Sequence, residues 1–117
     1  MKLLIVDDSE GFRSVVRSSL SSLCAEIEEC SDGDQALALY SKGPSDVILM
    51  DIRMEGMNGL ITTQRITARD HNAKIVILTA FDDEDLRWAA RQAGASGYML
   101  KDDLQGLVEL ISSLTRK

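Results

Sequence analysis

Short runs rich in apolar residues recur along the chain, with room for a helix between one run and the next. The runs are Leu3–Val6, Val47–Met50 and Lys74–Leu78, and each is followed by polar or glycine residues and then by a stretch with helical periodicity. The second and third runs lack polar alternation, as expected of parallel strands that helices cover on both faces. This repeated strand-then-helix pattern predicts an α/β architecture.

The helical stretches carry apolar residues at three- and four-residue spacing, which predicts one core-facing side for each helix. These positions are Phe12, Val15, Val16, Leu20 and Leu23, then Leu86, Ala89, Ala90 and Ala93, then Leu104, Leu107, Val108, Ile111 and Leu114. Asp32, three residues before Gln35, predicts a capping box at the start of one helix. Asp102, three residues before Gln105, predicts another, and Gly94 is expected to end a helix.

The strand-then-helix units fit one domain, because 117 residues is the common size of an independently folding unit, and residues 1–117 are expected to form it. Right-handed crossovers between successive strands give a three-layer, doubly wound parallel sheet with helices on both faces. Five strands in the flavodoxin-like order 2-1-3-4-5 are expected. Ala25–Cys30 alternates between polar and apolar residues, which predicts an edge strand.

Charge and hydropathy exclude several classes of protein. A formal net charge of −6 argues against direct nucleic-acid binding by this domain, since such binding needs a basic face. The apolar runs are too short to cross a bilayer and no signal-peptide pattern opens the sequence, so a cytoplasmic location without a membrane partner is expected. Cys24 and Cys30 are the only cysteines and are expected to be reduced packing residues.

Reactive side chains stand at the ends of four predicted strands. They are Asp7 and Asp8 on the first strand, Asp51 on the third, Thr79 on the fourth and Lys101 on the fifth. In open α/β sheets, function collects at the carboxyl ends of the strands, near the point where the strand order reverses. In the order 2-1-3-4-5 these side chains are expected to converge on one pocket.

Each of these residues alone has an ordinary structural explanation. Asp8 can help to cap a helix, Thr79 is a good strand former, and Lys101 can simply be solvated. Three carboxylates in one cleft, however, repel one another and raise one another's pKa unless a cation neutralises them. An oxygen-only site of this kind fits Mg²⁺, which uses few carboxylates and keeps several waters.

A metal beside a carboxylate, a hydroxyl and an ammonium group suits phosphoryl transfer. The carboxylate attacks phosphorus, the metal and the lysine neutralise phosphate oxygens, and the threonine donates a hydrogen bond to one of them. The stretches LLIVDDSE, VILMDIRMEGMNG, IVILTAFDD and GASGYMLKD, in this order and spacing, resemble the receiver (CheY-like) domain of bacterial two-component response regulators. The resemblance covers essentially the whole chain.

The resemblance implies a role for each acidic residue. Asp51 is expected to be the phosphoacceptor, phosphorylated by a sensor histidine kinase. Asp8 and Asp51 are expected to ligate Mg²⁺ together with the backbone carbonyl of Arg53, while Asp7 holds the ion through water. The domain is expected to catalyse only its own phosphorylation and dephosphorylation, so it is not classed as an enzyme.

The resemblance also implies how a signal leaves the site. Thr79 and Lys101 are expected to bind the phosphoryl group, and Tyr98 to be an aromatic switch residue. The segment GASGYMLKD is most like receivers of the LuxR/NarL type, which precede a helix-turn-helix DNA-binding domain. The sequence lacks such a domain, so it is expected to be either an isolated receiver from a larger regulator or a natural single-domain protein. In the first case the expected output is transcription regulation through the absent DNA-binding domain. Phosphorylation is expected to favour a homodimer.

Two positions depart from the family pattern, and two further residues, His71 and Trp88, have no role that the resemblance assigns. Glu55 stands where proline usually occurs, which predicts a looser and more negative loop over the metal. Asp102 replaces a proline found in many receivers, which disfavours a cis peptide bond there. His71 is expected to be a solvated loop residue. Trp88 falls off its core stripe and is either part of a partner surface or a tolerated exposed aromatic.

Three other functions are compatible with parts of this pattern. A pseudo-receiver would keep the fold as a protein-interaction module and never accept phosphate. An aspartyl-phosphate-type hydrolase would also use an aspartate nucleophile and Mg²⁺, but Arg53 occupies the position, two residues after Asp51, where those enzymes have a second aspartate. A flavodoxin would bind a phosphate at the first loop, where acidic residues crowd in this chain. The site, rather than the fold, separates these functions.

Overall fold

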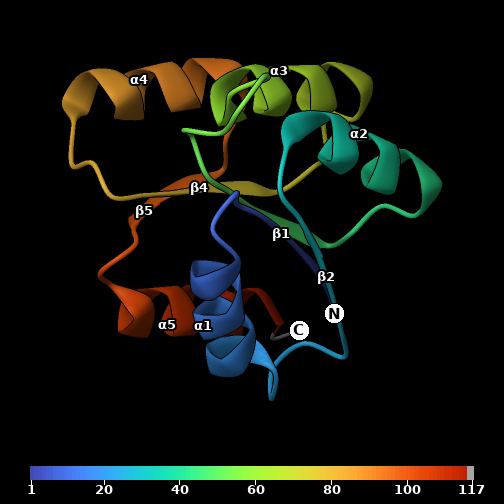
Figure 1. The fold of residues 1–117 in the computed structure, drawn as a ribbon, viewed down its shortest axis with the longest axis vertical. Helices are drawn as coiled ribbons and strands as arrows, with labels where there is room; N and C mark the ends of the chain where they lie inside the picture. The colour runs from blue at the N-terminus through green and yellow to red at the C-terminus, as the bar shows by residue number, and fades with distance from the viewer. Residues whose placement is uncertain (116–117) are drawn as a thin grey trace.

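The computed structural model describes residues 1–115, in which strands and helices alternate from the first element to the last (Figure 1). The strands are β1 Lys2–Val6, β2 Glu26–Cys30, β3 Val47–Met50, β4 Ile75–Thr79 and β5 Gly97–Leu100. The helices are α1 Glu10–Leu20, α2 Gly33–Lys42, α3 Gly59–Arg69, α4 Glu84–Ala93 and α5 Leu104–Thr115. The predicted strand-then-helix units are therefore present.

The strands form one parallel sheet in the order β2-β1-β3-β4-β5, which confirms the predicted flavodoxin-like topology. Leu3 of β1 pairs with Ile27 of β2 on one side and with Val47 of β3 on the other. The strand β2 lies at an edge of the sheet, as the alternation of Ala25–Cys30 predicted. Because the strand order reverses between β1 and β3, the carboxyl ends of these two strands meet at the switch point.

Helices cover both faces of the sheet (Figure 1). On one face, strand residues such as Leu4 form a core with one buried residue from each of α2, α3 and α4, namely Ala36, Ile66 and Ala90. On the other face, Leu3 belongs to a second core that α1 and α5 complete. Successive residues of Leu3–Val6, Val47–Met50 and Ile75–Leu78 belong to opposite cores, so every position of these runs is apolar. Burial on both faces therefore explains why these runs lack alternation.

Two of the predicted helix ends are confirmed by their hydrogen bonds. The Asp32 carboxylate accepts from the Gln35 amide at 2.8 Å, and the Gln35 side chain accepts from the Ser31 amide at 3.1 Å. The Gln35 side chain thus bonds to the amide of Ser31, one residue before the Asp32 amide that a standard capping box would use. Gly94 ends α4 with a φ of 103°, in the left-handed region that glycine enters without steric cost.

The predicted cap at Asp102 is wrong by one residue. The helix α5 begins at Leu104, and Asp103 Oδ1 accepts from the Gly106 amide at 2.9 Å. The Asp103 amide donates to the Leu100 carbonyl at 3.0 Å, so a tight turn after β5 delays the start of the helix. Two adjacent aspartates offer equivalent caps in the sequence, and the turn selects the second.

One position of the predicted core stripe of α1 is also wrong. Val15 is 46% exposed, whereas Val16 and Leu20 are fully buried. Neighbouring residues on a helix point about 100° apart, so Val15 and Val16 cannot both face the sheet. Trp88 is 64% exposed, as its place off the stripe of α4 predicted, and its contact with a partner stays a prediction.

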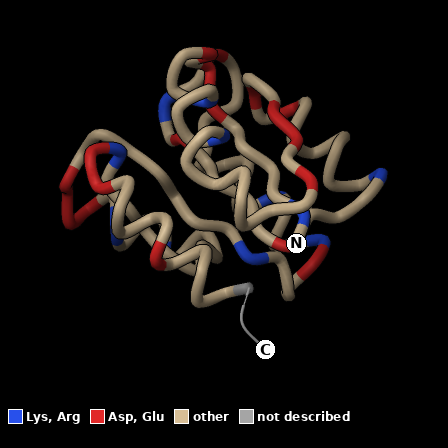
Figure 2. The backbone as a smooth tube through the Cα atoms, turned by 90° about the horizontal axis from the view of Figure 1, so that it is seen from below, with Lys and Arg blue, Asp and Glu red and all other residues tan. Residues whose placement is uncertain are grey.

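The remaining expectations from composition concern the distribution of charge, membrane-spanning helices and the two cysteines. Along the part of the chain shown in Figure 2, Lys and Arg are interspersed with Asp and Glu. No helix within residues 1–115 is long and apolar enough to cross a membrane. Cys24 and Cys30 are free and buried, and burial raises the pKa of the Cys30 thiol to about 11, so both behave as packing residues.

Candidate functional site

Two buried carboxylates lie at the carboxyl ends of the central strands. Asp7 follows β1 and is 2% exposed, while Asp51 follows β3 and is 7% exposed. Backbone hydrogen bonds continue the sheet beyond the strands, because the Asp7 amide donates to the Cys30 carbonyl at 3.1 Å and the Asp51 amide to the Val6 carbonyl at 2.9 Å. The sheet itself therefore fixes the backbone that carries both carboxylates.

Lys101, which follows β5, forms ion pairs with both carboxylates. Its Nζ lies 2.7 Å from Asp7 Oδ2 and 3.4 Å from Asp51 Oδ1. Burial lowers the pKa of Lys101, but the hydrogen bond to Asp7 and the charge of Asp51 raise it more, so the ammonium group stays charged. The Phe12 ring centroid lies 4.5 Å from the same nitrogen, and the Lys101 amide donates to the Thr79 carbonyl at 2.8 Å.

Asp8 adds a third carboxylate to this group. One carboxylate oxygen each from Asp7, Asp8 and Asp51 lies within 4.8 Å of the others, and Asp8 is the exposed member. Burial and the charge of Asp7 raise the pKa of Asp51 to about 6, although Lys101 opposes this shift. A crowded oxygen-only group with one member open to solvent fits a hard divalent cation such as Mg²⁺.

A glycine at the start of α3 allows that helix to approach Asp51 closely. A Cβ atom at Gly59 would lie 1.8 Å from the Asp51 carbonyl oxygen, and the Gly59 amide donates to the Ile52 carbonyl at 2.8 Å. Asn58 caps the helix through its side chain. These contacts close the short loop that contains Arg53. Sequence reasoning did not single out Gly59, because only the fold brings a backbone carbonyl against it.

The loop between β4 and α4 joins Thr79 to Tyr98. The Phe81 amide donates to Thr79 Oγ1 at 3.3 Å, and the Tyr98 hydroxyl donates to the Phe81 carbonyl at 2.5 Å. Two guanidinium groups stack on these rings: that of Arg53 lies 4.2 Å from the Phe81 centroid and that of Arg87 lies 4.5 Å from the Tyr98 centroid. Sequence reasoning missed Phe81 and Arg87, since an exposed loop aromatic and a surface arginine leave no periodic signal.

The chain matches the response regulator receiver domain family over residues 3–112. The chain belongs to this family. Receivers interact with histidine kinases in two-component signalling and bind Mg²⁺ through an acidic cluster of the kind formed by Asp7, Asp8 and Asp51. They are signal transducers rather than enzymes in the general case.

Relatives of this receiver are transcriptional regulators of the LuxR/NarL type. The chain is 38% identical to the nitrate/nitrite response regulator protein NarP of Escherichia coli, covering 94% of this chain and 53% of NarP. A LuxR-family two-component response regulator from Aurantimonas superposes with a TM-score of 0.89 and 29% identity, covering 97% of this chain and 84% of that one. The receiver spans about half the length of the curated relatives it matches.

A solved CheX–CheY–BeF₃–Mg²⁺ complex from Borrelia burgdorferi superposes with a TM-score of 0.91 at 26% identity, covering 100% of this chain and 90% of that one. Together with the relatives, this likeness confirms the predicted resemblance to CheY-like receivers, and in particular to those of the LuxR/NarL type. The aspartyl-phosphate-type hydrolase gains no support from these relatives.

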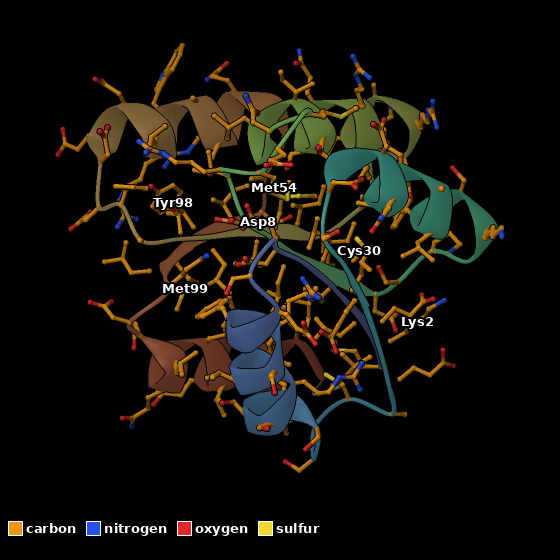
Figure 3. The ribbon with its side chains drawn as sticks, in the orientation of Figure 1. Lys2, Asp8, Cys30, Met54, Tyr98 and Met99 are labelled. Carbon is orange, nitrogen blue, oxygen red and sulfur yellow. The ribbon has the colours of Figure 1, made fainter. Side chains whose placement is uncertain are left out.

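The receiver brings most of the predicted site residues together. Asp7, Asp8, Asp51 and Lys101 form one polar group, to which Thr79 is joined through the backbone of Lys101. Figure 3 shows Asp8 and Met54 near the centre of the view and Tyr98 to one side, beneath α4. Tyr98 is linked to Thr79 through Phe81 of the β4–α4 loop, in addition to the pairing of β5 with β4.

A separate cavity lies away from the acidic cluster. This cavity of about 780 Å³ lies at the opposite end of the sheet, where Tyr40, Asp46 and Asp70 are among its lining residues. None of the predicted site residues lines it.

Proposed function

We propose that this receiver accepts a phosphoryl group on Asp51 from a sensor histidine kinase, in a reaction that depends on Mg²⁺. The observation that carries the proposal is the ion pairing of one half-buried ammonium group, on Lys101, with the two buried members of three clustered carboxylates. Burial, together with the charge of Asp7, raises the pKa of Asp51 to about 6, a perturbation typical of functional sites that a pseudo-receiver would not need.

The hydrogen bonds favour Asp51 over Asp7 as the acceptor. Both oxygens of Asp7 are engaged, Oδ1 by the Ser9 amide at 2.8 Å and Oδ2 by Lys101. Asp51 has one ion pair, on Oδ1, at the longer distance of 3.4 Å. Within residues 1–115, no hydrogen bond or ion pair occupies Asp51 Oδ2, and that oxygen is free to act as the nucleophile.

The residues of the cluster would hold the cation in different ways. Asp8 and Asp51 would bind Mg²⁺ directly, together with the backbone carbonyl of Arg53, and Asp7 would bind through a water molecule because Lys101 and Ser9 already occupy it. When bound, Mg²⁺ neutralises the negative charge shared by the carboxylates and the phosphoryl oxygens. Glu55, in the following loop, would add negative charge near that ion.

Transfer forms an oxygen–phosphorus bond at Asp51 and breaks the phosphorus–nitrogen bond of the kinase phosphohistidine, whose nitrogen keeps the electron pair. Lys101 would move from Asp51 Oδ1 to a phosphoryl oxygen, and its high pKa keeps it cationic throughout. Thr79 would donate its hydroxyl hydrogen to another phosphoryl oxygen. The receiver would then promote hydrolysis of its own acyl phosphate.

Thr79 and Tyr98 would carry the change away from the phosphoryl group. The Thr79 oxygen now accepts from the Phe81 amide, and the Tyr98 hydroxyl donates to the Phe81 carbonyl. A phosphoryl charge near −2 draws the Thr79 hydroxyl towards it and alters the first bond. Because Phe81 supplies both the amide bonded to Thr79 and the carbonyl bonded to Tyr98, a shift at Thr79 would bias the position of Tyr98.

The output would be transcription regulation through a DNA-binding domain, as in the relatives about twice as long as this chain. Residues 1–117 would form one receiver domain, active in the cytoplasm without binding nucleic acid or membrane itself. Phosphorylation would favour a homodimer. Sedimentation with and without beryllofluoride tests that last step, and an unchanged monomer over a wide concentration range would contradict it.

Intact-mass measurement after incubation with acetyl phosphate tests the central proposal. One added phosphoryl group per chain, dependent on MgCl₂, is the expected result. A gain of mass that forms fully in excess chelator would exclude the metal, and no gain with any donor or kinase would favour a pseudo-receiver. Steady release of phosphate from a phosphorylated metabolite would instead indicate a hydrolase.

A further inference from the structure

Arg13, on the first turns of α1, connects the site to the edge strand β2. Its Nη1 donates to the backbone carbonyl of Asp7 at 2.6 Å, and its Nε donates to Glu29 Oε1 at 3.0 Å. The Arg13 side chain is 16% exposed and the Glu29 side chain 25% exposed, so both bonds lie largely out of solvent. Hydrogen bonds of a charged donor at these distances are stronger than neutral ones.

The carbonyl that Arg13 binds belongs to the peptide joining Asp7 to Asp8. The rest of Asp7 is already held, since its amide donates to Cys30 and its carboxylate binds Ser9 and Lys101. Within the described residues, the Asp8 carboxylate has no hydrogen bond or ion pair of its own. The direction of the Asp8 side chain is therefore set by the backbone, and Arg13 fixes the plane of the peptide that precedes it.

We propose that Arg13 is a positioning residue that orients Asp8 for Mg²⁺ through the Asp7 carbonyl, while Glu29 holds its guanidinium in place. The inference rests on the proposed metal-dependent function. Arg13 lies outside the acidic cluster. Its planar guanidinium donates from α1 to the Asp7 carbonyl, at the end of β1, and to the Glu29 carboxylate on β2. Groups that orient a ligand in this way commonly set metal affinity without contacting the metal.

Arg17 provides a matched comparison on the same helix. It shares the Glu29 carboxylate with Arg13, through a contact from Nε to Oε2 at 2.5 Å. Its second bond goes to the Ile27 carbonyl at 2.8 Å, within β2 and away from the acidic cluster. The two arginines therefore differ in one respect that matters here: only Arg13 reaches the peptide between Asp7 and Asp8.

Calorimetric titration of the metal-free chain with MgCl₂ tests the inference directly. Arg13→Ala is expected to weaken Mg²⁺ binding by roughly 10-fold or more, the usual effect of removing a group that orients a ligand. Arg17→Ala is expected to leave the affinity within about twofold of the unchanged chain, because it leaves the Asp7 carbonyl bond in place. Equal losses in the two variants, or no loss in Arg13→Ala, would overturn the proposal.

Amide hydrogen exchange without metal separates this inference from the proposed function. Arg13→Ala is expected to speed exchange at Ser9, whose amide bonds to Asp7 Oδ1 in the turn that Arg13 holds, and Arg17→Ala to leave it unchanged. If the unchanged chain binds no Mg²⁺, the metal-dependent function fails, while the exchange result still shows whether Arg13 holds the turn. Unaltered exchange at Ser9 in Arg13→Ala would overturn the positioning role on its own.

Discussion

The floor of the site and the loop beside it are held in contrasting ways. The pocket floor is formed by the buried acids Asp7 and Asp51 and the half-buried Lys101, which two ion pairs join, and the backbone of both acids is tied into the sheet. The outer loop, residues 80–83 between β4 and α4, carries Phe81, which is 39% exposed. Tyr98 of β5 donates a hydrogen bond to the Phe81 carbonyl of this loop.

The difference matches two separate requirements. Phosphoryl transfer needs charged groups that already stand in place, since moving them during the reaction would cost free energy. A conformational signal needs an element whose alternative positions differ by only a few kcal/mol, and few exposed contacts provide that. The floor accordingly holds paired charges on buried backbone, whereas the outer loop carries Asp82 and Asp83 in solvent and makes aromatic contacts at the surface.

Replacement of the acceptor Asp51 should have the largest effect on phosphorylation, and its effect should be confined to the pocket floor. Asp51→Asn removes the nucleophilic oxygen but keeps the side-chain volume, so phosphorylation by acetyl phosphate or a kinase is expected to disappear while the fold persists. Intact mass measures the first result and circular dichroism the second. A full mass gain in this variant would place the acceptor elsewhere.

Removal of the other two acids should distinguish a direct ligand from one that acts through water. Asp8→Ala is expected to reduce Mg²⁺ binding below detection, whereas Asp7→Ala should weaken it by roughly 10-fold, because Lys101 and Ser9 already occupy both Asp7 oxygens. Calorimetric titration measures both. Asp34→Ala, which removes an exposed acid of α2, serves as the control and should change nothing. Equal losses at Asp7 and Asp8 would contradict the assigned roles.

The crowding of the floor should also appear in stability without any metal. The pKa of Asp51 is about 6 in the folded chain, against an ordinary aspartate value near 3.8. Between these values the folded state binds more protons than the unfolded state, so the free energy of unfolding should fall as pH rises through this window, by about 3 kcal/mol. Denaturation by urea across this pH range measures the slope.

Two further measurements sharpen that result. Asp51→Asn should remove most of the slope and stabilise the metal-free chain near neutral pH, since no charge is then forced into the cluster. Addition of MgCl₂ to the unchanged chain should restore stability at neutral pH by binding the folded state. A stability profile that is identical in the two chains would mean that the ionised Asp51 carries no cost.

The sequence predicted the floor better than it predicted the loop. Asp7, Asp8, Asp51 and Lys101 each follow an apolar run, and the parallel topology alone brings the ends of such runs together. Val15 and Asp102 were misassigned because two adjacent valines, or two adjacent aspartates, offer equivalent positions that only the three-dimensional packing and the turn after β5 distinguish.

The contacts of the outer loop could not be foreseen for a different reason. Phe81 joins Thr79, Tyr98 and Arg53 through one backbone amide, one carbonyl and the face of its ring. Such contacts depend on how two loops and an edge strand meet in space, and no spacing along the chain encodes them. The same holds for Arg13, whose partner is a backbone carbonyl that any residue at position 7 would supply.

The smallest predicted effect lies in the outer loop and tests whether it is as weakly held as the comparison implies. Tyr98→Phe removes the hydroxyl that donates to the Phe81 carbonyl but keeps a ring for Arg87 to stack on. Loss of one exposed hydrogen bond, worth about 1 kcal/mol, should speed amide exchange in residues 80–83 by roughly fivefold. Phosphorylation of Asp51 should stay nearly intact, because the floor is untouched.

Tyr40→Phe is the matched control for that experiment, since it removes a tyrosine hydroxyl that bonds to Asp70 at 2.6 Å, at the other end of the sheet. Tyr40→Phe should leave amide exchange in residues 80–83 unchanged.

Beryllofluoride should shift the NMR signals of the Tyr98 ring in the unchanged chain. Thr79→Ala should lose much of that shift while still accepting phosphate. Two results together would contradict this role of the outer loop: equal amide exchange in residues 80–83 of Tyr98→Phe and Tyr40→Phe, and Tyr98 ring signals that beryllofluoride does not shift. The loop would then be as rigid as the floor, and the signal would leave Asp51 by another route.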